Sequence, residues 1–199
     1  MRMLLAVAAT AAALGMNDTA LAEGSAEAGQ QKSAVCVACH GTDGNSLNPE
    51  WPSLAGQHAE FIADQLAAFK SGERQNPLMS PMAIGLTEQD MLDLAAYYSS
   101  QSPAALEADP ELVEAGRKLY VGGDQERGIA ACIACHGPTG RGNPMAGYPV
   151  VAGQHAVYAA GTLRAYASGE RANAMMQEIA AKLSEEDIAA VTSYIQGLR

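Results

Sequence analysis

The sequence contains the pentapeptide Cys-x-x-Cys-His twice, first as Cys36-Val37-Ala38-Cys39-His40 and again as Cys132-Ile133-Ala134-Cys135-His136. The two copies lie 96 residues apart. The stretch that follows each copy repeats as well, since WPSLAGQH at 51–58 corresponds to YPVVAGQH at 148–155 at an offset of 97 residues. A period of this length is too long for a solenoid. It indicates two duplicated domains, each of fewer than about 100 residues.

Each pentapeptide carries the groups needed to attach one haem. Two thiols three residues apart can each add to one vinyl group of the same haem, and the adjacent imidazole can bind its iron. Two copies in register are a much stronger signal than one. The motifs therefore predict two covalently attached haem c groups, with these attachment cysteines and proximal ligands: Cys36, Cys39 and His40; Cys132, Cys135 and His136.

Three other uses of the cysteines are weaker. A zinc site built from all four thiolates would have to bridge the two domains. A redox-active Cys-x-x-Cys pair expects an adjoining βαβ pattern, which the sequence lacks. Local disulfides would give no reason for a histidine to follow both motifs.

The N-terminus has the pattern of a secretory signal peptide. The positive segment Met1-Arg2-Met3 precedes an uncharged run at 4–15, and Ala20-Leu21-Ala22 fits a small-x-small cleavage site. The apolar run is shorter than the roughly 20 residues that span a bilayer, so an uncleaved anchor is the weaker interpretation. No later stretch is long or apolar enough to cross a membrane. We therefore expect cleavage after about residue 22 and a periplasmic mature protein.

Composition excludes several classes of protein. The chain of 199 residues has 12 basic and 22 acidic residues and a formal charge of −10, which disfavours binding to nucleic acid or to anionic lipid. An apolar fraction of 48% excludes a wholly disordered chain. Much of that fraction is alanine, however, and only two Phe and one Trp are present. Two small cores are hard to fill with such side chains, and a buried porphyrin in each domain would supply the missing apolar body.

The sequence predicts helices and no strands. Apolar residues at i, i+3, i+4 and i+7 form a stripe behind each of two N-cap signatures, TEQD at 87–90 and SEED at 184–187. We expect further helices at 58–70 and 155–167, ended by Gly72 and Gly169, and a first helix at about 26–35 with a counterpart that begins near Pro110. The segments 41–57 and 137–154 should be loops.

The domain boundary is expected in the segment 101–110, which has Pro near both ends and little apolar content. We therefore divide the chain into a signal peptide at 1–22, an N-terminal domain at 23–103 and a C-terminal domain at 104–199. The first domain has three basic and ten acidic residues, a net charge of −7, and the second has eight and eleven, a net charge of −3. This asymmetry could orient the molecule toward partners, or it could reflect two ordinary solvated faces.

The repeat also indicates the second axial ligand of each iron. Among the methionines that follow the motifs, only Met79 and Met176 occupy equivalent positions. Met82 and Met175 align with other apolar residues and are expected in the core, and Met145 matches nothing in the first copy. His/Met ligation raises the reduction potential and closes the iron to substrates, which favours electron transfer over oxygen or peroxide chemistry.

His58 and His155 are the rival distal ligands, because they also align, each at the start of a helix. Ligation by them would give bis-His iron of much lower potential. We prefer to interpret both as exposed residues that pack on the preceding loop, since two aligned methionines are available.

On these motifs the mature chain resembles the cytochrome c4 family, periplasmic dihaem cytochromes made of two tandem class I cytochrome c domains. The resemblance covers essentially all of 23–199, including the ending SYIQGL at 193–198. It implies an all-α protein in which each small helical domain encloses one covalently bound haem, with the haems facing each other across the domain interface. It also implies that the carbonyls of Pro52 and Pro149 accept the Nδ1–H of the proximal histidines.

The family implies a respiratory electron carrier with no catalytic step, loosely associated with the membrane or soluble, between a quinol-oxidising complex and a terminal oxidase. A peroxidase would need an open iron, and a haem subunit of a periplasmic dehydrogenase would need a tight flavoprotein or quinoprotein partner. A haem-based sensor would need a signalling domain. Arg74 and Arg171 are equivalent and could meet haem propionates, although an arginine at a helix end is more often simply solvated.

Overall fold

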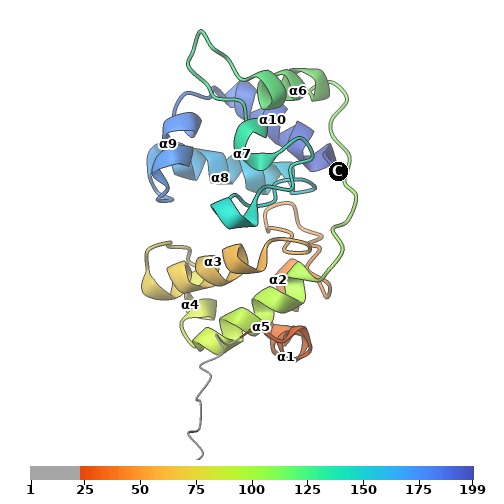
Figure 1. Cartoon of the computed structure of the whole chain (residues 1–199), viewed down its shortest axis with the longest axis vertical. Helices are drawn as coiled ribbons and strands as arrows, with labels where there is room; N and C mark the ends of the chain where they lie inside the picture. The colour runs from red at the N-terminus through yellow and green to blue at the C-terminus, as the bar shows by residue number, and fades with distance from the viewer. Residues whose placement is uncertain (1–22) are drawn as a thin grey trace, which may run out of the picture.

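The computed structural model describes residues 23–199 as two helical units, one above the other (Figure 1). The predicted signal peptide at 1–22 lies outside the described residues. Within 23–199 no strand is formed, and the only extended pairings are two isolated bridges in the second half, Asp124 with Ile129 and Asn143 with Tyr148. The expected all-α fold class is therefore confirmed.

In the N-terminal unit the first and last helices cross at a glycine. Its elements in order are α1 (Ala26–Lys32), η1 (Ser33–Val35), α2 (Val37–His40), α3 (Ala59–Ser71), α4 (Met79–Ala83) and α5 (Glu88–Ser99). Helix α1 packs closely on α5, because an added Cβ at Gly29 would lie 2.0 Å from the carbonyl oxygen of Asp93. The buried core of this unit centres on Leu94, Tyr98 and Ile62.

The C-terminal unit repeats this arrangement. Its elements are α6 (Val113–Gly122), α7 (Ile133–His136), η2 (Pro144–Ala146), α8 (Ala156–Ser168), α9 (Ala174–Ala180) and α10 (Glu185–Gly197). Helix α6 packs on α10 at Gly116, where an added Cβ would lie 2.1 Å from the carbonyl oxygen of Ala190. Unlike the first unit, the second inserts a loop at 123–131 between its first helix and the cysteine motif. Helix α6 begins at Val113, three residues after the start that the sequence predicted near Pro110.

Local signals in the sequence fix the ends of the main helices. Thr87 and Ser184 cap α5 and α10, and in each case the aspartate three residues later bonds back to complete a capping box. Gly72 and Gly169 end α3 and α8 with φ of 82° and 79°, the left-handed conformation that glycine adopts without steric cost. These expectations are confirmed, and the apolar stripes of α5 and α10 are buried as predicted.

The segment between the two units is extended and packed rather than loose. The backbone N–H of Ala104 donates to Asn45 Oδ1 at 2.7 Å in the first unit, and the N–H of Asp109 donates to Ser193 Oγ at 2.8 Å in the second. The expected domain division at 103/104 falls within this segment and stays a prediction.

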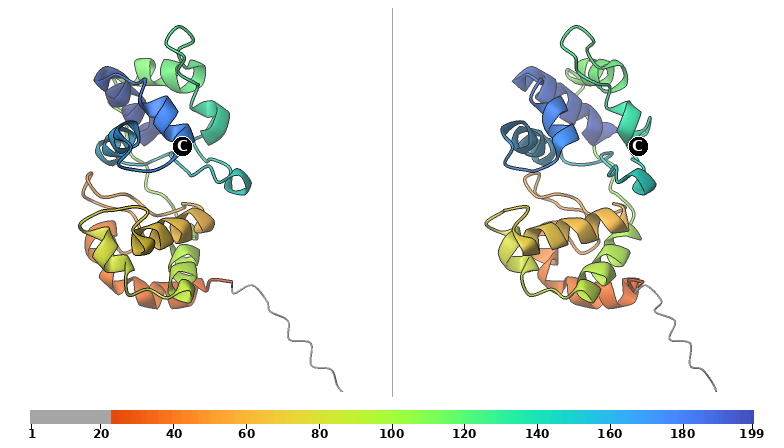
Figure 2. Two further views of the ribbon diagram at one scale, coloured as in Figure 1. Left: turned by 90° about the vertical axis from the view of Figure 1, so that its left-hand side faces the viewer. Right: turned by 60° about the vertical axis from the view of Figure 1, so that its left-hand side comes forward.

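Helices α3 and α8 face each other between the two units (Figures 1 and 2). Tyr158 of α8 donates its backbone N–H to the carbonyl of Pro49 at 3.0 Å, and further bonds described below cross the same boundary. Among the helices of residues 23–199, none combines the length and the apolar character needed to cross a membrane.

Candidate haem centres

Both cysteine motifs form a single turn of helix. Cys36 and Cys132 sit at the N-cap positions of α2 and α7, and the N–H of each following histidine donates to the carbonyl of that cysteine at 2.9 Å. One turn therefore brings both thiols and the imidazole of each motif close together. Within 23–199 all four cysteines are free and partly buried, which contradicts a local disulfide in either motif.

The first cysteine of each motif lies against the apolar core rather than in an activating environment. Cys36 packs on the core around Leu94, and Cys132 packs on the core around Tyr120. Burial raises the pKa of the Cys132 thiol to about 11 and also raises that of Cys36. A redox-active Cys-x-x-Cys pair needs a thiol of lowered pKa, so these sites do not suit thiol–disulfide exchange.

The motif histidines are held by carbonyl oxygens, as the resemblance implied. His40 Nδ1 donates to the carbonyl of Pro52 at 2.8 Å, and His136 Nδ1 donates to the carbonyl of Pro149 at 3.0 Å. Because a carbonyl only accepts, the proton lies on Nδ1 and the lone pair on Nε2. Burial lowers the pKa of both imidazoles, which keeps them neutral and able to bind a metal.

The two aligned methionines occupy the same place in the two units. Met79 begins α4 and Met176 lies in the first turn of α9, and both are half-buried. The backbone N–H of each donates at 2.9 Å to the side-chain oxygen of an asparagine three residues earlier, Asn76 or Asn173. The two asparagines also align at an offset of 97, but the sequence alone did not show that they bond to the two methionines.

Three of the other methionines, Met82, Met145 and Met175, lie outside the core. Met82 is 45% exposed and Met175 is 49% exposed, so the expectation that both are buried is wrong. The reason is that α4 and α9 are short surface helices that bury only one side, marked by Ala83 and Ala180. Met145 lies in a loop and is 95% exposed.

The aligned histidines start helices as predicted, but they are not exposed. His155 is 8% exposed, and its Nε2 donates to the carbonyl of Ser46 in the other unit at 2.8 Å. This bond occupies the nitrogen that a distal ligand would need, which disfavours bis-His ligation in the second unit. His58 is half-buried, and its Nε2 is buried without a hydrogen-bond partner among residues 23–199.

The two aligned arginines meet at the boundary between the units. Arg74 and Arg171 both donate to Gln65 Oε1 at 2.7 Å, and Arg74 also donates to the Tyr158 hydroxyl at 3.1 Å. Arg171 is only 8% exposed, so the expectation of a simply solvated side chain is wrong there. Sequence reasoning paired these arginines by the repeat but could not show that they converge.

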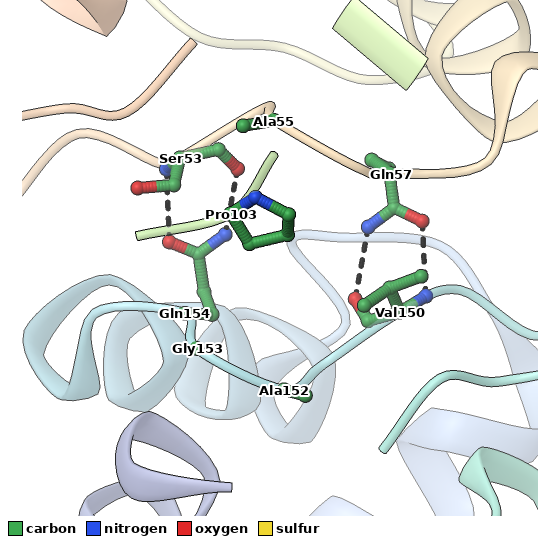
Figure 3. Close-up of a pocket in the computed structure, with 8 residues that line it drawn as sticks. All are labelled: Ser53, Ala55, Gln57, Pro103, Val150, Ala152, Gly153 and Gln154. Carbon is green, nitrogen blue, oxygen red and sulfur yellow. Dashed lines mark hydrogen bonds between the residues drawn. The ribbon is translucent and has the colours of Figure 1, made fainter. Parts of the chain in front are cut away.

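A second set of contacts between the units involves two glutamines (Figure 3). Gln57 of the first unit bonds to both backbone groups of Val150, and Gln154 of the second unit bonds to both backbone groups of Ser53. Figure 3 shows the two amides reaching in opposite directions, each to the chain segment of the other unit, with Pro103 drawn between them. Both glutamines lie in the repeated Gly-Gln-His segment, but the sequence alone did not predict a role for them.

The residues present fit a haem better than a bare metal ion. Within 23–199 no cluster of three or more His, Cys, Asp or Glu side chains is arranged to hold a metal, which disfavours the zinc alternative. Each unit instead brings two free thiols and one oriented imidazole to a single helical turn. These are the groups that a covalently attached haem requires.

Known proteins give the same picture. The family model described as cytochrome c matches this chain twice, at 26–102 and 113–199. Cytochrome c4 of Azotobacter vinelandii is 47% identical over 198 residues, covering 93% of this chain and 94% of that protein. The crystal structure of reduced recombinant cytochrome c4 from Pseudomonas stutzeri matches with a TM-score of 0.86 at 46% identity, covering 88% of this chain and 100% of that one. A thiosulfate dehydrogenase electron acceptor of Thiomonas intermedia is 35% identical, covering 98% of this chain and 90% of that protein.

Proposed function

This chain belongs to the cytochrome c4 family, and from that premise we propose that it is a periplasmic carrier that passes electrons between redox proteins and catalyses no reaction of its own. Its two cytochrome c domains carry two covalently attached haem c groups, one for each Cys-x-x-Cys-His motif. Bound haem supplies one-electron chemistry at its iron. The protein's part is to attach, orient and enclose that group.

We assign the axial ligands from the repeat and the geometry. His40 and Met79 would bind the iron of the N-terminal domain, and His136 and Met176 that of the C-terminal domain. One observation supports this assignment, and it recurs in both domains. Each imidazole is fixed through Nδ1 by a prolyl carbonyl, and the backbone N–H of each methionine donates to an equivalent asparagine. A thioether at the sixth position closes the iron to small substrates, so a peroxidase is disfavoured.

The proposed donor is a quinol-oxidising complex and the proposed acceptor is a terminal oxidase, as in a respiratory chain. Supporting this, the net charge of −10 suits encounter with positively charged faces of partner proteins. The larger share of that charge lies on the N-terminal domain. Long-range attraction would therefore turn this domain toward a basic partner and raise the association rate more than the affinity.

A second candidate is suggested by the thiosulfate dehydrogenase electron acceptor. At 35% identity over nearly the whole chain, this similarity favours a role as acceptor from a sulfur-oxidising dehydrogenase. The two candidates share a fold and haem content and differ only in the donor.

Stopped-flow reduction of the oxidised holoprotein separates them. Supplied at equal concentration, a quinol-oxidising complex with its quinol should reduce the protein faster than a thiosulfate dehydrogenase with thiosulfate. The reverse order would favour the second candidate. Fewer than two covalent haems per chain in the same preparation, counted by pyridine haemochrome, would contradict both.

A further inference from the structure

The proximal histidine of the C-terminal domain begins a hydrogen-bond chain that ends in the N-terminal domain. His136 Nδ1 donates to the carbonyl of Pro149 at 3.0 Å. The N–H of that same peptide bond belongs to Val150, and it donates to Gln57 Oε1 at 2.9 Å. One amide plane therefore joins the imidazole of one domain to a glutamine of the other.

The proximal histidine of the N-terminal domain begins an equivalent hydrogen-bond chain that ends in the C-terminal domain. His40 Nδ1 donates to the carbonyl of Pro52 at 2.8 Å. The N–H of this peptide belongs to Ser53, and it donates to Gln154 Oε1 at 3.0 Å. The two chains are related by the internal repeat, because Gln57 and Gln154 lie 97 residues apart.

Each glutamine is held so that its amide cannot easily turn away. Gln57 Nε2 donates to the carbonyl of Val150 at 2.8 Å, and Gln57 Oε1 also accepts the backbone N–H of His58 at 3.0 Å. The amide is thus held by its own helix start and by the opposite loop, and Figure 3 shows the two bonds to Val150. Gln154 makes the matching bonds to Ser53 and His155, at 2.9 and 3.0 Å.

Such a chain affects the imidazole through the shared peptide. An acceptor on the N–H of an amide polarises that amide and makes its carbonyl oxygen a stronger acceptor. A stronger acceptor at Nδ1–H fixes the imidazole orientation and raises the basicity of Nε2. A more basic Nε2 on the proximal histidine stabilises the oxidised iron and lowers the reduction potential of that haem.

We propose that Gln57 and Gln154 are crosswise positioning residues, each setting the proximal histidine, and hence the haem potential, of the domain to which it does not belong. Gln57 acts on His136, and Gln154 acts on His40. This inference rests on the proposed ligation by those two histidines. The contact between the domains would then be part of each redox centre rather than only a scaffold.

Gln57→Met tests this, because methionine has a similar length and does not accept the Val150 N–H. The reduction equilibrium constant of the C-terminal haem should rise about two- to fivefold, or about 20–40 mV at 59 mV per tenfold for one electron, and that of the N-terminal haem should stay unchanged. Gln154→Met is the matched control and should show the reverse. Gln57→Glu retains an oxygen for the Val150 N–H and should not raise the C-terminal potential.

The readout is a redox titration of the holoprotein followed by proton NMR. The haems are assigned by which methionine methyl resonance is lost in Met79→Leu and in Met176→Leu. The Nδ1 proton of His136 should move upfield in Gln57→Met and stay in place in Gln154→Met. Loosening of the interface alone would move both potentials together, and a shift of both haems, or of the haem in the mutated domain, would overturn the proposal. Absence of methionine-ligated signals from the parent protein would instead overturn the ligand assignment.

Discussion

The crossing of α6 and α10 depends on the missing side chain of Gly116. A Cβ at this position would lie 2.1 Å from the carbonyl oxygen of Ala190 and 2.7 Å from Tyr194 Cβ. The closer of these atoms is backbone in the middle of a helix, so it cannot move aside alone. Gly116→Ala would therefore force the two helices apart by about 1 Å to restore ordinary contact.

Two opposing effects set the magnitude. Alanine favours the helix over glycine by about 1 kcal/mol, whereas overpacking of a tight contact costs about 1–3 kcal/mol and separation of α6 from α10 loses further contacts. We expect a net loss of about 2 kcal/mol in the free energy of unfolding. For a domain of this size that corresponds to a fall of about 8–16 °C in its Tm, less if both domains unfold together.

Gly161→Ala is the control, because Gly161 also lies inside a helix of the same domain and has no atom within 4 Å of an added Cβ. There only the helix preference acts, and a gain of about 0.5–1 kcal/mol is expected. Thermal unfolding of both holoproteins, followed by far-UV circular dichroism, should move the two midpoints in opposite directions. If Gly116→Ala melted at or above the parent protein, the close crossing would be wrong.

Three further outcomes follow from the charges and the ligands. The Lys32 ammonium and other donors lower the pKa of Asp93 to about 2, below the ordinary value of an aspartate. The contribution of the Asp93 carboxylate to stability should therefore be complete above about pH 5 and lost as the pH falls toward 2. The urea midpoints at pH 7 and pH 3 should differ less in Asp93→Asn than in the parent protein. Charge steering predicts that the association rate with a basic redox partner falls steeply with ionic strength, and a rate independent of salt in stopped-flow would refute it. Met176→Leu should abolish the methionine–iron absorption band of one haem and leave the other, whereas Met175→Leu, in the neighbouring exposed residue, should leave both bands intact.

Periodicity and capping signals predicted the helices well because they are local. The apolar residues behind Thr87 and behind Ser184 each form one stripe along their helix, so 3.6-residue spacing was enough to identify α5 and α10. The cysteine motifs are equally local, since one helical turn sets the relation of the thiols to the imidazole.

Contacts between the domains could not be read in the same way. The burial of His155 depends on a carbonyl 109 residues earlier, and the pairing of Gln57 with Val150 spans 93 residues. No periodicity encodes such distances. The repeat did show that Gln57 is equivalent to Gln154 and His58 to His155, but it did not show what these side chains contact.

The prediction that Met82 and Met175 are buried was wrong for a different reason. An apolar residue aligned with another apolar residue indicates a shared environment only if the helix is covered on that side. Helices α4 and α9 are too short to be covered on more than one face, so Ala83 and Ala180 are buried, whereas Met82 and Met175 are not.

We propose that each domain holds its iron between the motif histidine and the aligned methionine. Proton NMR of the fully reduced holoprotein tests it most directly, because a methionine bound to haem iron has a methyl resonance moved far upfield by the porphyrin ring current. Two such resonances are expected, one lost in Met79→Leu and the other in Met176→Leu. A spectrum with none, or one in which these substitutions leave both resonances in place, would contradict it.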